Sequence, residues 1–145
     1  MEETDAKILR LLNADGRMSY TDIGKETGLS TSAAQQRVRR LEARGVIRGY
    51  TALIDPCALG RSLTAFVSIR PFDASQPDDA PERLEHLDCV ISCYSVAGEH
   101  SYLLKVQVPG PTDLEQALSE IRTAANVSTH TTLVLSVPFE ERVPQ

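Results

Sequence analysis

The sequence predicts an α+β protein in which an N-terminal helix-turn-helix precedes a C-terminal βαββαβ ferredoxin-like domain. Two observations carry this prediction. Within the first 45 residues, two helical patterns are separated by a short connection that contains Gly28, which is the arrangement of a helix-turn-helix. After Gly60 the pattern changes to four strands and two helices in the order βαββαβ, which is typical of a ferredoxin-like sandwich.

The chain divides by these patterns into three parts. Residues 1–50 are the expected helix-turn-helix domain, residues 51–60 a linker with a short strand, and residues 61–145 the βαββαβ domain. A domain of about 60 residues buries only roughly 60% of the surface that its unfolded chain exposes. We therefore expect the small domains to gain stability from each other or from an oligomer.

The N-terminal helices have clear start and stop signals. The first is expected from Thr4 to Asn13, with an apolar stripe on one side. Ser19 is a natural N-cap for the second helix, and Gly28 suits the left-handed residue that ends it. Ser30 can cap a third helix, which Gly45 closes. The expected inward residues of that third helix are Ala34, Val38 and Leu41.

The third helix has the residue distribution of a DNA-recognition helix. Its start is small and polar, and the stretch from Arg37 to Arg48 holds five arginines against the single acid Glu42. The net charge of −5 divides into +1 for residues 1–60 and −6 for residues 61–145. Since short polar side chains suit base edges and cations suit phosphates, this helix is predicted to enter the major groove of double-stranded DNA.

The candidate DNA contacts fall into three groups. Amide and guanidinium groups pair bidentately with bases, so Gln35, Gln36 and Arg37 are the candidates for base edges. Phosphate contacts are expected from Arg39, Arg40 and Arg44. The starts of the second and third helices add the polar residues Ser19, Tyr20, Thr21, Ser30, Thr31 and Ser32. For Tyr20, packing against the first helix is an equally weighted alternative.

The C-terminal elements follow from strand and helix patterns. The four strands are expected at Leu63–Arg70, Val90–Ala97, Tyr102–Val108 and Val127–Val137. A short helix is expected at Pro81–Leu87, and a longer one behind a capping box at Thr112–Glu115. Two helices would cover one face of the sheet. The other face, which carries Lys105 and Gln107, would be solvated or pack against a second subunit.

Composition and the remaining motifs point away from several functional classes. The acidic N-terminus predicts no signal peptide, and no apolar run is long enough to span a membrane. Cys57, Cys89 and Cys93 are expected to be reduced thiols in a cytoplasmic protein. The histidines lack metal-ligand spacing, and neither a catalytic triad order, paired carboxylates nor a phosphate loop is present. We therefore expect no metal, no cofactor and no enzyme.

Short motifs along nearly the whole chain resemble the leucine-responsive/asparagine-regulator (Lrp/AsnC, feast/famine) transcription factors. The N-terminal motifs are Asp5-x-x-Ile8-Leu9, Asp15-Gly16-Arg17, Gly28-Leu29-Ser30, Arg37-Val38-x-x-Leu41-Glu42, Gly45-Val46-Ile47 and Gly49-Tyr50. Farther on come Asp55-Pro56, Leu59-Gly60, Ala97-Gly98, Tyr102-Leu103-Leu104 and Val127. The resemblance implies a winged-type helix-turn-helix joined to an ACT-like (RAM) effector domain, homodimers that assemble into octamers, and amino acids as effectors.

The resemblance also implies where an effector would bind. In this family the site lies between subunits, near the loop that joins the second and third strands. That loop corresponds here to Ala97, Gly98, Glu99, His100, Ser101 and Tyr102. The family commonly has an aspartate at the position of Ser101, where it helps to fix the effector's amino group; Glu99 or His100 could supply part of that polarity. Across the interface, His130 and Thr132 are candidates by position.

The sequence thus predicts a sequence-specific DNA-binding transcriptional regulator, cytoplasmic and associated with the nucleoid. Its oligomeric state or DNA affinity would respond to a small effector, an amino acid. Two alternatives remain at this point. One is a nucleoid-architectural protein that binds DNA without an effector. The other is a haem-precursor decarboxylase on the same fold, which would need a tetrapyrrole pocket with well-placed histidines.

Overall fold

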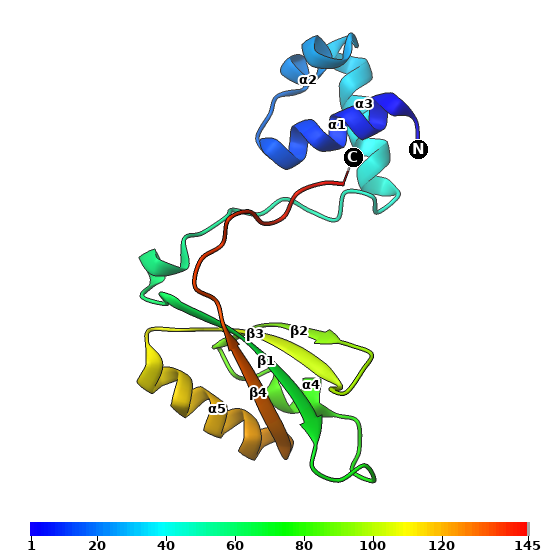
Figure 1. Ribbon diagram of the computed structural model, residues 1–145. Helices are drawn as coiled ribbons and strands as arrows, with labels where there is room; N and C mark the ends of the chain where they lie inside the picture. Colours follow the sequence, from blue (N-terminus) through cyan, green and yellow to red (C-terminus); the bar gives the residue numbers. More distant parts are fainter. Residues whose placement is uncertain (145) are drawn as a thin grey trace. The chain divides into compact units, whose positions relative to one another are not determined.

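The computed structural model describes residues 1–144, and these form two compact units (Figure 1). The first unit comprises residues 1–53 together with the residues from Pro138 onward, and the second comprises residues 54–137. Among the described residues, no helix is long and apolar enough to cross a membrane.

The first unit is a bundle of three helices around a small apolar core. The helices are α1 (Glu3–Ala14), α2 (Tyr20–Thr27) and α3 (Thr31–Ala43). The core contains one residue from α1, one from α2 and three from α3, namely Ile8, Ile23, Ala34, Val38 and Leu41. The three residues from α3 are those that the periodicity of the sequence assigned to its inner side.

The starts of α2 and α3 are each fixed by a local hydrogen bond, and a glycine ends α2. The Ser19 hydroxyl accepts from the backbone N–H of Asp22, and the Ser30 hydroxyl accepts from that of Ala33, each at 3.1 Å. Gly28 ends α2 in the left-handed conformation, with φ of 74°. These three predictions are confirmed. Gly24 is buried one turn earlier, and a Cβ there would lie 2.5 Å from the carbonyl oxygen of Leu29, so only glycine permits this close turn.

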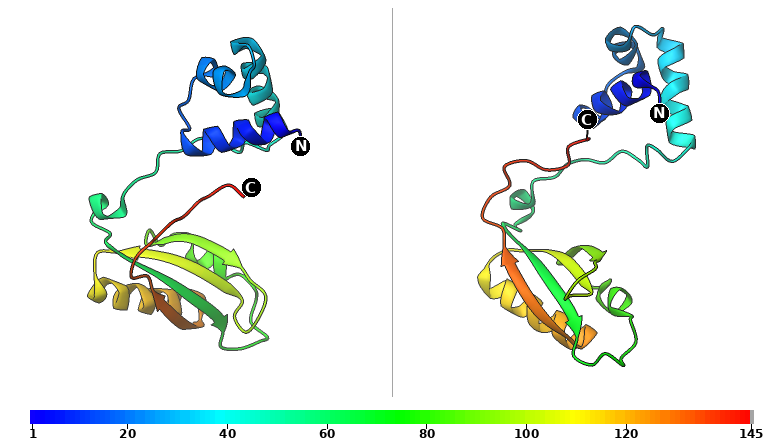
Figure 2. Two further views of the ribbon diagram at one scale, coloured as in Figure 1. Left: turned by 45° about the horizontal axis from the view of Figure 1, so that its top comes forward. Right: turned by 45° about the vertical axis from the view of Figure 1, so that its right-hand side comes forward.

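The second unit is a four-stranded antiparallel sheet with two helices on one face (Figures 1 and 2). Its elements are β1 (Leu63–Pro71), α4 (Ala80–Leu84), β2 (Val90–Ser95), β3 (Tyr102–Val108), α5 (Pro111–Ala125) and β4 (Val127–Leu133). The strand order is β2-β3-β1-β4, as the predicted βαββαβ topology requires.

The two faces of this sheet differ in burial. On the helix side, alternate residues of β1 and β3 are buried against α4 and α5. Val67 and Leu104 are 0% exposed there, as is Ile121 of α5. The other face carries the intervening residues, among which Ser68 lies opposite His130 in the register of β1 and β4. Lys105 belongs to this second face, as the sequence pattern predicts.

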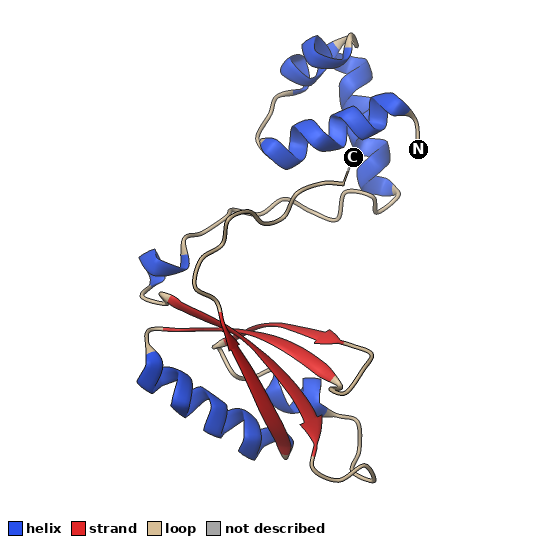
Figure 3. Ribbon diagram, viewed as in Figure 1, coloured by secondary structure: helices blue, strands red, loops and turns tan. Residues whose placement is uncertain are grey.

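The linker differs from its prediction. Residues 51–60 form no strand; their only regular element is the 3₁₀ helix η1 (Pro56–Leu59), and loop precedes it (Figure 3). A strand requires a neighbouring strand to satisfy its backbone hydrogen bonds, and the single chain provides none for this segment.

Several boundaries in the second unit also differ, among them the end of β2 at Ser95 rather than Ala97. Helix α5 begins at Pro111 without a side-chain cap, so the capping box expected at Thr112–Glu115 is wrong. Proline suits the first helical position because its fixed φ is helical and no N–H is lost there. Strand β4 ends at Leu133, and α4 ends at Leu84 rather than Leu87. Beyond Leu133, the N–H of Val134 donates to the carbonyl of Thr64. Thr64 is the second residue of β1, so almost no further residue of β1 is available to pair with a longer β4.

Candidate DNA-binding surface and effector site

The outer side of α3 presents the polar residues that the sequence assigned to DNA. With 3.6 residues per turn, Ser32, Gln36 and Arg39 lie opposite the buried Ala34 and Val38, and all three are exposed. Arg40 is also exposed, whereas Gln35 is half-buried toward one edge of this side. Arg44 follows the helix as its C-cap and is exposed.

The starts of α2 and α3 lie together. The hydroxyl of Thr31 donates to that of Thr21 at 3.4 Å, and the hydroxyls of Ser30 and Ser32 are 3.3 Å apart. Both helices direct N-terminal backbone N–H groups and the positive end of their dipoles toward this region, which favours an anion such as phosphate. Because Ser19 and Ser30 act as N-caps, their hydroxyls are engaged in holding the helix starts.

Arg37 is held inside the helical unit. Its Nη1 donates to Glu2 Oε2 at 2.7 Å and to Asp5 Oδ1 at 2.9 Å. The hydrogen bonds that Arg37 donates to these two carboxylates raise the pKa of its guanidinium. The structure therefore gives Arg37 a role in joining α3 to α1, in place of the predicted role at base edges. The sequence carried no signal for this pairing, because its partners lie 32 and 35 residues away.

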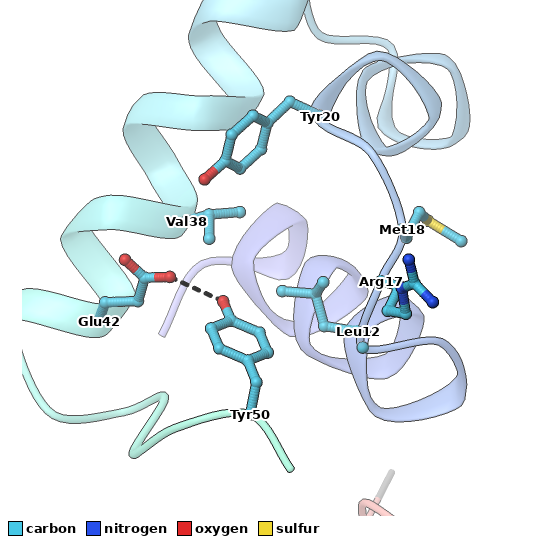
Figure 4. A pocket seen from close by; sticks show the side chains of 8 residues that line it. Leu12, Arg17, Met18, Tyr20, Val38, Glu42 and Tyr50 are labelled. Carbon is cyan, nitrogen blue, oxygen red and sulfur yellow. Dashed lines mark hydrogen bonds between the residues drawn. The ribbon is translucent and has the colours of Figure 1, made fainter. Parts of the chain in front are cut away.

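Tyr20 packs inside the helical unit, which favours the packing alternative. It is half-buried against the apolar core and lines a pocket of about 180 Å³ between α1 and α3, together with Leu12 and Val38 (Figure 4). Tyr50, directly before the linker, lines the same pocket and donates to Glu42 Oε1 at 2.7 Å. Burial and the bond to Glu42 raise the pKa of Tyr50 to about 12. Sequence reasoning missed this contact.

The loop between β2 and β3 brings several predicted effector residues together. The Ser101 N–H donates to the carbonyl of Ile69 at 2.9 Å, which ties the loop to β1. The rings of His100 and His130 are stacked with centroids 6.1 Å apart. Glu99 lies 3.5 Å from the guanidinium of Arg70.

The remaining predicted effector residues lie around this group. Ala97 and Gly98 are exposed in the loop. Thr132 is exposed on β4, two residues beyond His130 and opposite Phe66. Tyr102 begins β3 on the helix side of the sheet.

A pocket of about 130 Å³ lies directly beside this loop. Ser101 and Tyr102 line it together with Arg70, Gln76 and Asp78. The Tyr102 hydroxyl donates to Asp78 Oδ1 at 2.7 Å, and this bond raises the pKa of Tyr102 to about 12. Asp78 comes from the segment between β1 and α4, from which the sequence analysis named no candidate site residue.

Two family models match the chain along most of its length. Residues 1–42 match the AsnC-type helix-turn-helix domain, and residues 64–144 match the Lrp/AsnC ligand binding domain. The chain belongs to the Lrp/AsnC family. This assignment confirms the resemblance found in the sequence, and the fold matches solved Lrp/AsnC structures.

Individual relatives agree with the family assignment. The Lrp/AsnC chain is 52% identical to the transcriptional regulator LrpA of Mycobacterium tuberculosis, over 98% of this chain and 95% of that protein. It is 38% identical to the leucine-responsive regulatory protein of Escherichia coli, over 83% of this chain and 74% of that protein.

Solved structures extend the comparison to three dimensions. A feast or famine regulatory protein of M. tuberculosis complexed with L-methionine is 52% identical, with a TM-score of 0.93 over 99% of this chain and 97% of that one. AsnC of E. coli is 28% identical, with a TM-score of 0.85 over 99% and 97% of the two chains. The protein is accordingly a DNA-binding transcriptional regulator with a ligand-binding domain, and neither the architectural nor the decarboxylase alternative is favoured.

Proposed function

We propose that this Lrp/AsnC regulator reads DNA through the outer side of α3. The observation that carries the proposal is the exposure of Gln36 beside Ser32, Arg39 and Arg40, opposite the buried core of the helix. The side-chain amide of Gln36 can pair with the edge of an adenine. Gln35, at the edge of the exposed side of α3, provides a second amide for base contacts. Arg39, Arg40 and Arg44 supply phosphate contacts, which set affinity and its dependence on salt.

The starts of the two helices would anchor the backbone of the DNA. Thr21, Thr31 and Ser32 present hydroxyls beside the N-terminal ends of α2 and α3, and such ends bind phosphate through their N–H groups. One helix-turn-helix contacts only a short stretch of DNA. Two reading helices, with half-sites about 34–36 Å apart or a multiple of that, would give the affinity that an operator needs.

The effector in this proposal is an amino acid bound near the loop of residues 97–102. Support comes from the match to a ligand-binding domain and from the L-methionine complex of the M. tuberculosis relative. His100 and His130, which stack at 6.1 Å, and the Glu99–Arg70 pair place polar and charged groups at one end of the sheet. We further propose homodimers that assemble into an octamer and act on the chromosome.

A bound amino acid can change DNA affinity only if it binds one assembly better than another. We propose that binding at this loop changes the assembly of subunits and hence the spacing of the α3 helices. Sedimentation velocity and DNA mobility-shift assays, each with and without a panel of free amino acids, test this. We expect at least one amino acid to change both the oligomer distribution and the DNA affinity. If none changes either, the effector part of the proposal is wrong.

A further inference from the structure

The pocket beside Ser101 contains a carboxylate from another part of the chain. Asp78 lines this pocket together with Ser101 and Tyr102. Asp78 reaches it from the segment between β1 and α4, whereas Ser101 comes from the loop between β2 and β3.

The hydrogen bonds around the pocket leave polar atoms available. Tyr102 occupies Asp78 Oδ1, and among the described residues Asp78 Oδ2 and the Ser101 hydroxyl have no hydrogen-bond partner. Because the Tyr102 pKa is raised to about 12, its phenol stays protonated at neutral pH and continues to donate to Asp78. One carboxylate oxygen is thus held in place while the other remains free to accept a hydrogen bond from a ligand.

The segment that carries Asp78 is ordered by its own contacts. Asp73 Oδ1 accepts from both the N–H and the hydroxyl of Ser75. Gln76 donates to the carbonyl of Ala125 and accepts from the amide of Asn126, which fixes the segment to the end of α5. The walls of the pocket are therefore formed before any ligand arrives, and a preformed site loses less entropy on binding.

The size of the pocket limits what can enter it. Its volume of about 130 Å³ is well below the roughly 300–1,000 Å³ of sites that enclose a whole drug-sized ligand. An ammonium group with the carbons next to it fits this space, whereas the rest of a larger ligand would lie outside. Arg70 lines the same pocket with its side chain 51% exposed and one nitrogen 3.5 Å from Glu99, so its other N–H groups can bind the carboxylate of a zwitterion.

We propose that Asp78 and Ser101 together bind the α-ammonium group of an amino-acid effector, with the Asp78 carboxylate taking the role that an aspartate at position 101 has in related proteins. This inference rests on the proposed function, because it assumes that an amino acid is the effector. It adds the residue that supplies the negative charge and the pocket that receives the ammonium end.

The variant Asp78→Asn tests the inference with little structural disturbance. An asparagine can still accept the hydrogen bond from Tyr102 while losing the negative charge. Isothermal titration calorimetry is run with each of the twenty L-amino acids on the full-length protein. For the amino acid that binds best, we expect Asp78→Asn to bind roughly tenfold more weakly or worse, because a charge-assisted hydrogen bond is lost. The double variant Asp78→Asn/Ser101→Asp should recover much of that affinity.

Two controls separate the outcomes. Asp88→Asn, an exposed carboxylate outside the pocket, should bind like the wild type. The wild type is also titrated with the deaminated analogue of the same amino acid, which should bind at least roughly tenfold more weakly; this readout remains if Asp78→Asn fails to fold. If Asp78→Asn or the deaminated analogue binds normally, the inference is wrong while the proposed function stands. If no amino acid binds the wild type, both the inference and the effector part of the proposed function are wrong.

Discussion

Arg37 Nη1 donates to Asp5 Oδ1 at 2.9 Å and thereby joins α3 to α1 inside the DNA-binding unit. Asp5 is 8% exposed, and the Arg37 side chain is 24% exposed. Glu2 contributes a second carboxylate to the same guanidinium nitrogen. Arg37, near the middle of α3, is therefore held as a structural residue, while Arg39, Arg40 and Arg44 remain the proposed phosphate contacts.

Arg37→Ala should lower the melting temperature of the protein, because it leaves the buried Asp5 carboxylate without its partner. Thermal unfolding followed by circular dichroism measures this effect. Asp5→Ala removes the other partner and should also destabilise the unit. The slope of log affinity for DNA against log salt should be unchanged in Arg37→Ala at a temperature where it is folded. A slope reduced by one phosphate contact would contradict the structural role.

The outer residues of α3 should divide DNA recognition between them. Arg39→Ala or Arg40→Ala should weaken binding to every sequence and reduce the salt slope by about 1, since each removes one phosphate contact. Gln36→Ala should instead change the preference between sequences, by about 1–3 kcal/mol at one base pair, because it removes a base contact. Gln35→Ala should act in the same way. Mobility-shift titrations on specific and scrambled DNA at several salt concentrations measure both effects.

Arg122→Ala serves as the control for these variants. Arg122 lies on α5 in the second unit, where it donates to the hydroxyl of Thr129. Arg122→Ala removes the same positive charge as Arg39→Ala but lies outside the proposed DNA-binding surface. The salt slope of Arg122→Ala should therefore match that of the wild type. An equal loss of binding in Arg39→Ala, Gln36→Ala and Arg122→Ala would refute the assignment to α3.

Gly24 should be the glycine of the helix-turn-helix that tolerates substitution least. Gly24→Ala places a Cβ 2.5 Å from a backbone oxygen of Leu29, and such overpacking costs about 1–3 kcal/mol. Gly28→Asn is the matched comparison, because φ is 74° there but nothing lies within 4 Å, and asparagine tolerates that conformation. Chemical denaturation should rank Gly24→Ala as clearly less stable. Equal stability of the two variants would mean that the connection relaxes around the added methyl group.

The contact between Tyr50 and Glu42 should make part of the stability depend on alkaline pH. Folding raises the pKa of Tyr50 from 10.0 to about 12, through burial first and the bond to Glu42 second. Since the folded state favours the protonated phenol, this stabilisation is complete below pH 10 and is lost as the pH rises from 10 to 12. Tyr50→Phe should remove that pH-dependent component of the free energy of unfolding.

The measurement for Tyr50 is a difference titration of phenolate absorbance. Tyr102 also has a pKa of about 12, so the wild type alone would not distinguish the two groups. Subtracting the Tyr50→Phe curve from the wild-type curve should leave one transition near pH 12. A transition near pH 10 would mean that Tyr50 is not hydrogen-bonded to Glu42 in solution.

Much of the fold could be predicted because its signals are local. N-caps such as Ser19 and Ser30 act on N–H groups three residues away. The role of Gly28 in ending α2 depends only on its own backbone conformation. The buried side of α3 follows from helical periodicity. Alternation likewise assigned Leu104 and Lys105 to opposite faces of β3. The local rule failed at Thr112–Glu115, where the proline one residue earlier began α5 instead.

The amino-acid sequence by itself determined the helix-turn-helix, the βαββαβ order and the basic character of α3, because each depends on residues within a few positions. Only the tertiary structure decided which arginines face outward, since Arg37 pairs with residues more than thirty positions away. It also decided that Tyr20 lies inside, that Tyr50 contacts Glu42, and that Asp78 lies beside Ser101 and Tyr102. Folding brings these residues together from separate segments. The pattern of residues within one segment does not show which charged or bulky side chains another segment will place beside it.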